Sequence, residues 1–196
     1  MTDRETIAAY DKNVDAYVAL TERDGPGAVL LAFMQRVNPG GLVLDLGCGP
    51  AASSAMMRDH GLRVDPVDAS PEMVRLANDT YDIGARIGGF HDLTDFGRYD
   101  GVWANFSLLH ARPEDFPAHL RAIHRALVPG GIFHIGMKLG EGTRRDRLDR
   151  YYAYYSQDDL TEHLADAGFR VDDFSRGEEM GLAGDVEPWI TLLAVT

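Results

Sequence analysis

Two acidic residues flank a glycine-rich turn in the first third of the chain. Asp45 precedes Gly47 by two residues, and Gly49 completes the spacing G-x-G. Asp68 follows 21 residues after Gly47. Glycine lets a backbone approach a ligand closely, and a carboxylate can accept hydrogen bonds from two hydroxyl groups at once. These residue types and spacings predict a site for a cofactor that carries a ribose.

Known glycine turns hold several cofactors, which make different demands. A phosphate loop needs a lysine directly after a glycine, and neither Lys12 nor Lys138 follows a suitable one. A dinucleotide is harder to set aside, because Ala52 completes the fingerprint G-x-G-x-x-A. Against it, none of the eight tyrosines has a lysine four residues later, and Pro50 lacks the amide hydrogen that a pyrophosphate would use. An NAD(P)-binding oxidoreductase therefore remains an alternative function.

The segments around this turn alternate between strand and helix patterns. Short apolar runs such as 42–46 are typical of central parallel strands, and alternating strands and helices predict a doubly wound, mostly parallel α/β sheet. Ligands of such sheets bind beyond the carboxyl ends of the strands. The expected strands are 42–46, 62–70, 84–90, 99–106, 131–139, 169–174 and 188–196, and the expected helices are 3–20, 26–37, 51–58, 70–78, 113–127 and 156–167.

Residues 43–51, "VLDLGCGPA", resemble the first signature motif of the class I S-adenosylmethionine (SAM)-dependent methyltransferases, with Ala51 where the family usually has a third glycine. The resemblance continues through "PVDASPEMV", "YDGVWANFSLLH" and "LVPGGIFHI", and covers about Val43 to Ile135. Residues 150–169 are also similar to small stand-alone bacterial members. The resemblance implies a three-layer α/β/α fold whose seven-stranded sheet has an antiparallel last strand, for which 188–196 is the candidate.

The resemblance also implies the cofactor, SAM, and its product, S-adenosylhomocysteine. Asp45 matches the motif acid and Asp68 the acid that holds the ribose, whereas Asp92 would face the adenine. Tyr10 and Tyr17 resemble lid tyrosines that cover SAM, with core packing as the equal alternative. The expected cofactor-binding residues are Tyr10, Tyr17, Asp45, Gly47, Cys48, Gly49, Asp68, Ala69, Ser70, Met73, Asp92, Leu93, Asn105 and Phe106.

Residues that could act on a methyl acceptor follow the fourth and fifth expected strands. His110 is the first candidate for a general base and Tyr154 the second, because an imidazole titrates near neutral pH. The segment 139–155 combines arginines with tyrosines and predicts a substrate-facing insertion; its alternative is a solvated helix with tyrosines packed beneath. The candidate substrate residues are Arg144, Arg147, Tyr151 and Tyr155. The histidine spacing predicts no metal site.

Composition limits the class of partner. The 196 residues predict one domain, 1–196, with a helical lid at 1–38, a SAM-binding core at 41–138 and C-terminal elements at 156–196. A net charge of −12 argues against nucleic acid and anionic membranes as partners. A single cysteine and a polar N-terminus favour a cytoplasmic protein, expected as a monomer or homodimer. The predicted activity is methyl transfer to a small molecule, with a SAM-binding protein that transfers no methyl group as a further alternative.

Overall fold

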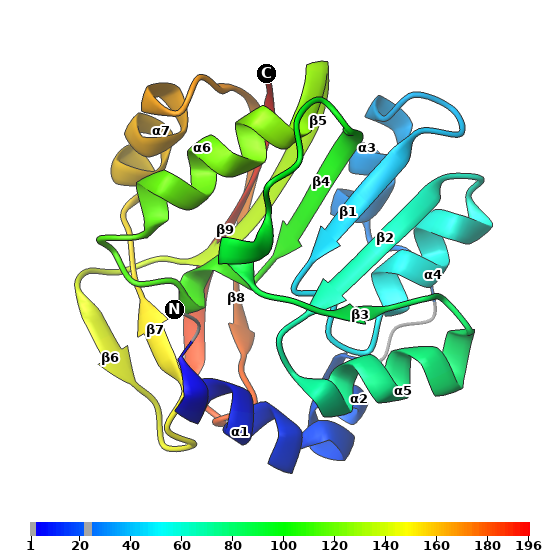
Figure 1. The fold of residues 1–196 in the computed structure, drawn as a ribbon. Coiled ribbons are helices and arrows are strands. Elements are labelled where there is room, and N and C mark those ends of the chain that lie inside the picture. Colours follow the sequence, from blue (N-terminus) through cyan, green and yellow to red (C-terminus); the bar gives the residue numbers. More distant parts are fainter. Residues whose placement is uncertain (1–2, 22–24) are drawn as a thin grey trace.

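The computed structural model describes residues 3–21 and 25–196, which fold around a seven-stranded sheet (Figure 1). The strand order is β3-β2-β1-β4-β5-β9-β8. Neighbouring strands from β3 to β5 are parallel, whereas β9 runs antiparallel to both β5 and β8. The predicted fold class, with its inserted antiparallel last strand, is therefore confirmed. The strands are β1 Leu42–Leu46, β2 Arg63–Asp68, β3 Arg86–Ile87, β4 Tyr99–Asn105, β5 Leu127–Lys138, β8 Arg170–Met180 and β9 Val186–Val195.

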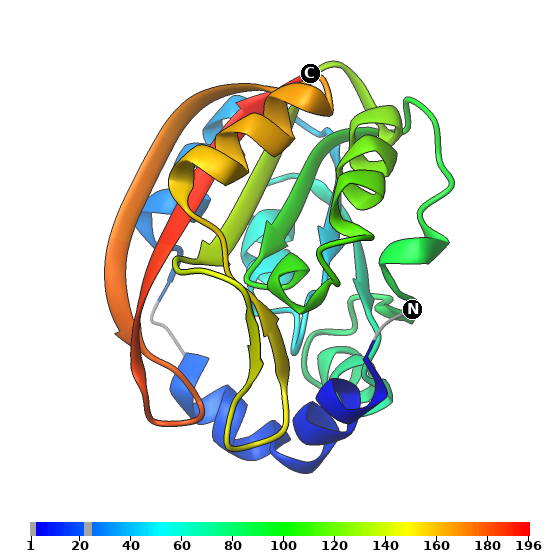
Figure 2. The ribbon, with the colours of Figure 1, turned by 90° about the vertical axis from the view of Figure 1, so that its left-hand side faces the viewer.

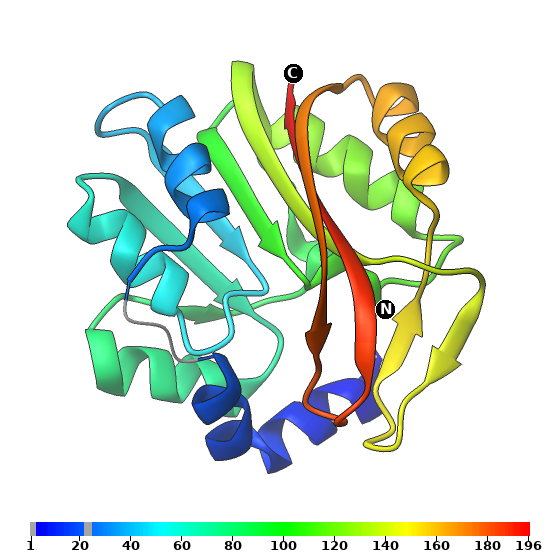
Figure 3. The same cartoon turned by 180° about the vertical axis from the view of Figure 1, so that it is seen from behind.

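Different helices cover the two faces of the sheet. Phe33 of α3 and Met57 of α4 are fully buried against one face, which Figure 3 shows from behind. Leu120 of α6 and Leu160 of α7 are fully buried against the other. Both faces are therefore apolar, as expected for parallel strands between two helical layers. The helices are α3 Ala28–Arg36, α4 Ala52–Asp59, α5 Pro71–Tyr81, α6 Phe116–Ala126 and α7 Gln157–Asp166.

The N-terminal segment lies beneath the carboxyl ends of β1, β2 and β4 (Figure 1). It forms two helices, α1 Arg4–Lys12 and α2 Val14–Thr21, so the expected single helix over 3–20 is wrong. The break falls at Asn13, whose side-chain amide donates to the carbonyl of Ala9 at 2.7 Å. Asparagine side chains compete in this way with the helical hydrogen bonds of the backbone. Of the helices in the described ranges, none is long and apolar enough to cross a membrane.

The segment 139–155 forms a hairpin, which contradicts its alternative interpretation as a solvated helix. Strand β6 (Thr143–Arg145) pairs antiparallel with β7 (Tyr151–Ala153), outside the main sheet. Figure 2 shows this hairpin beside α1 and the lower end of the β8–β9 pair. Strand β8 continues six residues beyond its predicted end at 174, to Met180. These extensions place segments from three parts of the chain around the lower end of the sheet.

Candidate functional site

Two adjoining cavities lie where β1, β2 and β4 end. The first, of about 670 Å³, is bounded by the turn after β1 and the end of β2, and we name it the glycine-turn cavity. The second, of about 1290 Å³ including space open to solvent, reaches toward β7 and the β8–β9 turn, and we name it the hairpin cavity. Both are lined by Tyr10, Tyr17, Gly47, Asn105 and Phe106. The carboxyl-end position agrees with the rule for ligand sites in such sheets.

The turn after β1 requires glycine at Gly47 for two reasons. Its φ of 82° is in the left-handed region, and a Cβ there would lie 2.3 Å from the Cβ of Ser107. Ser107 is fixed in that place because its hydroxyl donates to the carbonyl of Leu46 at 2.6 Å. Gly49 also has a positive φ, 53°, but a Cβ there would only touch the ring of Tyr17 at 3.5 Å. Gly47 is therefore required so that the loop that follows β4 can approach the turn closely.

Ala51 occupies the position where the family motif has its third glycine. The φ of Ala51 is 62°, and this fully buried residue precedes the first turn of α4. A left-handed conformation is unfavourable for alanine and costs glycine little. Ala51 is thus a strained residue at the edge of the site.

The two motif acids have different surroundings. Asp45 is buried and accepts a hydrogen bond from the Ser54 hydroxyl at 2.6 Å, and burial raises its pKa to about 7. Asp68 accepts the amide hydrogens of Gly49 and Ser70, each at 2.8 Å and each on a different carboxylate oxygen. Burial raises the pKa of Asp68 as well. Because a carboxylate has about four acceptor sites, Asp68 keeps capacity for hydroxyl donors.

The lid tyrosines lie at the site. The rings of Tyr10 and Tyr17 meet edge to face at 5.4 Å. The Tyr10 hydroxyl lies 2.9 Å from Nε2 of His110 and accepts a hydrogen bond from Arg150 at 3.1 Å. The lid is also tied to α5, because the Ser70 hydroxyl donates to Asp11 of α1 at 2.5 Å. These contacts join α1 to the sheet and to the hairpin.

His110 is buried at the end of the 3₁₀ turn η2 (Leu108–His110). Its Nδ1 lies 2.6 Å from the carbonyl oxygen of Tyr151. A carbonyl can only accept, so Nδ1 carries the proton and Nε2 accepts from the Tyr10 hydroxyl. Burial lowers the pKa of His110 to about 4, which keeps the ring neutral at pH 7. His110 thus fixes the orientation of the Tyr10 hydroxyl.

The other expected cofactor residues fall into two groups. Ala69, Ser70 and Met73 line the glycine-turn cavity, and Cys48 lines the hairpin cavity, where burial raises the pKa of its thiol. Asp92 and Leu93 line neither cavity. The Asp92 carboxylate instead accepts the amide hydrogen of Gly89 at 2.7 Å and caps the turn η1, Phe90–Asp92, and Leu93 is part of the core. Gly88, Gly89 and Phe90 line the cavity in their place.

Asn105 and Phe106 reach the site from the end of β4. The Asn105 side-chain oxygen lies 2.9 Å from Nε2 of His134, whose ring stacks on Trp103 at 3.6 Å. Burial lowers the pKa of His134 to about 3. Phe106 has a φ of 54°, which is unfavourable for an aromatic residue and turns the chain sharply after β4. A neutral histidine inside the sheet therefore holds the side chain of Asn105 at the cavity.

The expected acceptor-side residues contact other protein groups, one of which, Glu187, lines the hairpin cavity. Arg144 and the second candidate base, Tyr154, pair with Glu187. Arg147 donates to the carbonyl of Ala183, and the ring of Tyr155 stacks on Phe116 at 4.8 Å. Tyr151 packs against the guanidinium groups of Arg112 and Arg145. None of these five predicted residues (Arg144, Arg147, Tyr151, Tyr154, Tyr155) lines the glycine-turn or hairpin cavity.

Sequence reasoning missed Lys138, Glu187 and Trp189 in the lining of the hairpin cavity. Arg150 and Tyr152, which also line it, belong to the segment 139–155 that was expected to face the substrate. Lys138 could have been found, because it ends β5 just as Asn105 ends β4, and both ends lie at the ligand edge. Glu187 and Trp189 carry no comparable signal, because they begin an antiparallel strand that reaches the site only after the sheet forms.

Comparison with known proteins agrees with this geometry. A family model described as a methyltransferase domain matches residues 43–131. The cypemycin N-terminal methyltransferase of Streptomyces sp. is 37% identical over 132 residues, which cover 63% of this chain and 54% of that protein. The chain spans between 47% and 60% of the length of the first four curated relatives that it matches.

Solved structures show the same fold. The 1,6-didemethyltoxoflavin-N1-methyltransferase of Burkholderia thailandensis, with bound 1,6-didemethyltoxoflavin and S-adenosylhomocysteine, has a TM-score of 0.75 at 24% identity. The match covers 96% of this chain and 88% of that one. The [4+2]-cyclase SpnF, at 18% identity, has a TM-score of 0.73 and covers 96% of this chain and 94% of its own. In its strand order, in its glycine turn and over residues 43–131, the chain resembles the class I SAM-dependent methyltransferases.

Proposed function

We propose that the chain binds SAM in the glycine-turn cavity and transfers its methyl group to a small molecule in the hairpin cavity. The observation that carries this proposal is the common wall of the two cavities, which Tyr10, Tyr17, Gly47, Asn105 and Phe106 form at the strand ends. Group transfer between two bound molecules needs such a junction, because the reacting atoms must be held close together.

The residues of the glycine-turn cavity fit SAM. Asp68 would hold the ribose hydroxyls, since each of its oxygens binds one backbone amide and has an acceptor site left. Ala69, Met73 and Phe90 line the same cavity and would border the adenine. SAM would supply a methyl group already activated by its sulfonium leaving group. The task of the chain is then to orient both molecules and to exclude water.

If the acceptor arrives protonated, its proton would first contact Tyr10 of the lid. Tyr10 lines both cavities, whereas His110 lines only the glycine-turn cavity and is joined to the acceptor side through the Tyr10 hydroxyl. We therefore assign His110 a positioning role and Tyr10 the contact with the reacting groups. The lowered pKa of His110 makes it a weak base, which agrees with this division. Tyr154, whose hydroxyl lies between Arg144 and Glu187, has no role in this scheme.

The hairpin cavity supports a polar acceptor with a flat ring. Trp103, Tyr152 and Trp189 contribute aromatic surface. The ammonium of Lys138 pairs with Glu187 and lies 4.1 Å from the centre of the Tyr152 ring. Paired charges and aromatic walls favour a compact molecule that carries hydrogen-bonding groups. Arg150 adds a guanidinium to the same wall.

Calorimetry with S-adenosylhomocysteine and with NADH tests the cofactor. The first should bind and the second should not. Asp68→Asn should weaken S-adenosylhomocysteine binding about 10- to 100-fold, because charge-assisted hydrogen bonds to the ribose are lost. Asp79→Asn, which alters an exposed acid on α5, is the matched control and should bind normally. Binding of NADH in preference to S-adenosylhomocysteine would sink the proposal.

Release of S-adenosylhomocysteine tests the transfer. A panel of small phenols, amines, carboxylic acids and a short peptide with a free N-terminus should contain an acceptor that raises its formation above the background. Tyr10→Phe should lower kcat with that acceptor more than it weakens cofactor binding. Tight binding with no release across the panel would instead indicate a SAM-binding protein without transferase activity.

A further inference from the structure

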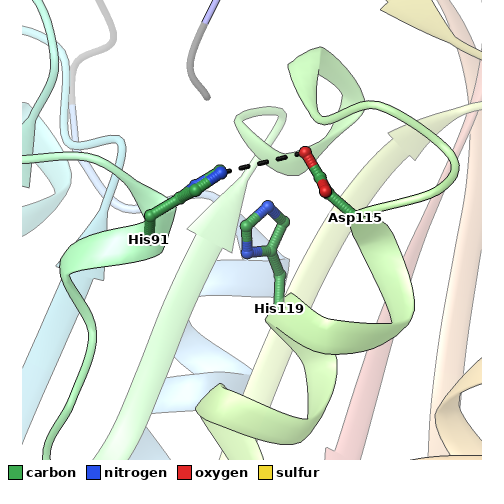
Figure 4. A group of neighbouring side chains, drawn as sticks. All are labelled: His91, Asp115 and His119. Carbon is green, nitrogen blue, oxygen red and sulfur yellow. Dashed lines mark ion pairs between the residues drawn. The ribbon is translucent and has the colours of Figure 1, made fainter.

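A cluster of two histidines and one aspartate lies next to the glycine-turn cavity but outside it. His91 belongs to the turn η1, Asp115 is the residue just before α6, and His119 follows one helical turn later. One ligand atom from each residue lies within 4.8 Å of the other two. Figure 4 shows the three side chains converging from the turn and the helix. Sequence spacing predicted no metal here, because His91 comes from a distant part of the chain.

The backbone positions the three side chains close together. Asp115 and His119 are four residues apart, so they share one face of α6. Nε2 of His91 lies 3.8 Å from a carboxylate oxygen of Asp115, and the two imidazole rings are 4.7 Å apart. His119 is buried, whereas His91 is exposed. An ion could therefore enter from the solvent side and meet a fixed inner ligand.

We propose that His91, Asp115 and His119 form a binding site for a divalent first-row transition metal ion, with Zn²⁺ as the type. Two imidazole nitrogens and one carboxylate oxygen are a ligand set that suits such ions, with water in the remaining position. Mg²⁺ and Ca²⁺ prefer all-oxygen sites and fit poorly. Ligand bonds of about 2.0–2.2 Å require the side chains to close by small rotations, which the exposed His91 permits.

Such an ion would act on a wall of the cofactor site. The ring of Phe90 lies 5.5 Å from that of His119 and lines the glycine-turn cavity. The turn that carries Phe90 and His91 follows a strand of two residues and is capped by its own Asp92. A metal bridge from His91 to α6 would fix this turn. The binding step itself does not depend on the methyl-transfer proposal.

Titration of the untagged, chelator-treated chain with ZnCl₂ tests the site. Zn²⁺ should bind one per chain and raise the Tm, because a ligand that binds only the folded state stabilises it. His91→Ala removes an exposed ligand and should abolish both effects. His60→Ala removes an exposed histidine at the end of α4 and should change neither. MgCl₂ should give no comparable shift.

Hydrogen exchange measures the effect on the turn. Zn²⁺ should slow amide exchange in residues 88–93 of the wild type and of His60→Ala, and should leave His91→Ala unchanged. Co²⁺ as a probe should give a visible absorption spectrum that His119→Ala loses. An equal Zn²⁺ response in wild type and His91→Ala, or no Zn²⁺ binding by the wild type, would overturn the proposal.

Discussion

The glycine-turn cavity and the hairpin cavity are built by different kinds of contact. In the first, side chains at strand ends meet backbone groups close by in the sheet, as when Asp68 binds the amides of Gly49 and Ser70. In the second, charged side chains bind partners far away in the sequence, as Lys138 does with Glu187 and Arg150 with the Tyr10 hydroxyl. The glycine-turn cavity is therefore specified locally, and the hairpin cavity by long-range pairs.

If the hairpin cavity takes the acceptor, as proposed, this difference lets one fold serve different acceptors. A side-chain pair such as Lys138–Glu187 can be exchanged for another without altering a single strand pairing. The turn at Gly47 cannot be changed so freely, because β1 packs there against the loop after β4. Substitutions on the two sides should consequently have different signatures. Substitutions near the hairpin should change the stability and docking of the lid. Substitutions at the turn should change the packing at the sheet edge and cofactor binding together.

Arg150→Met should give the largest effect on the acceptor side. The guanidinium is buried and donates to Asp146 at 2.6 and 2.9 Å and to the Tyr10 hydroxyl. Its loss leaves the largely buried Asp146 carboxylate without its cationic partner, held only by the amides of residues 148 and 150, so urea denaturation should show a loss of about 3–5 kcal/mol. The double variant Arg150→Met/Asp146→Leu should recover most of that loss. A cost below about 1 kcal/mol would mean that the pair behaves like an exposed one.

Gly47→Ala should be the most costly change at the turn, and Gly61→Ala is its control. Both glycines have a positive φ, 82° and 92°, but a Cβ at Gly61 meets no atom within 4 Å. Gly61→Ala should cost about 1–2 kcal/mol from the backbone alone. Gly47→Ala adds the collision with Ser107 and should cost about 3 kcal/mol or more. It should also abolish S-adenosylhomocysteine binding, and similar losses of stability in the two variants would contradict this.

The pH dependence of stability should distinguish two buried groups of the site, His110 and Asp45, because they titrate with opposite sign. His110, with its pKa lowered to about 4, stabilises the fold fully above pH 6.5 and loses this contribution as the pH falls toward 4. Asp45, with its pKa raised to about 7, destabilises progressively as the pH rises from about 4 to 7.

Denaturation at several pH values between 4.5 and 7.5 checks both assignments. His110→Gln should make stability fall more steeply with rising pH, and Asp45→Asn should make it rise more steeply. Each slope should change by at most about 1.4 kcal/mol per pH unit, the value for one proton. Parallel curves for wild type and either variant would show that the group in question titrates normally in the folded chain.

Ala51→Gly should produce the smallest change, and in the stabilising direction. The left-handed strain of alanine, about 1–2 kcal/mol, is removed, while the added freedom of glycine in the unfolded chain costs about 0.4–1 kcal/mol. A net gain of about 0.5–1 kcal/mol is expected from urea denaturation, with unchanged or tighter S-adenosylhomocysteine binding. Ala55→Gly in the interior of α4 should instead lose stability. A loss of stability for Ala51→Gly as well would show that Ala51 is not strained.

Much of the fold could be predicted because its signals are local. The apolar run 42–46, the Ser70-Pro71 helix start and the spacing to Asp68 each describe a strand, a cap or a turn within a few residues. The first helix was mispredicted where the local signal was weak, because Asn13 breaks it with a single side-chain bond. For residues 139–155 the sequence left a solvated helix open as an alternative, and the structure excludes it, because β6 and β7 form a hairpin in which Arg145 pairs with the distant Asp3.

The sequence alone determined the alternating α/β order, the glycine turn and the acid beyond β2, because each is a relation between residues joined by a short stretch of chain. The tertiary structure alone decided which side chains line the hairpin cavity. Lys138, Arg150 and Glu187 meet there because β9 inserts between β5 and β8 and because α1 docks on the hairpin. The same is true of His91 and His119, which only the packing of η1 against α6 brings together.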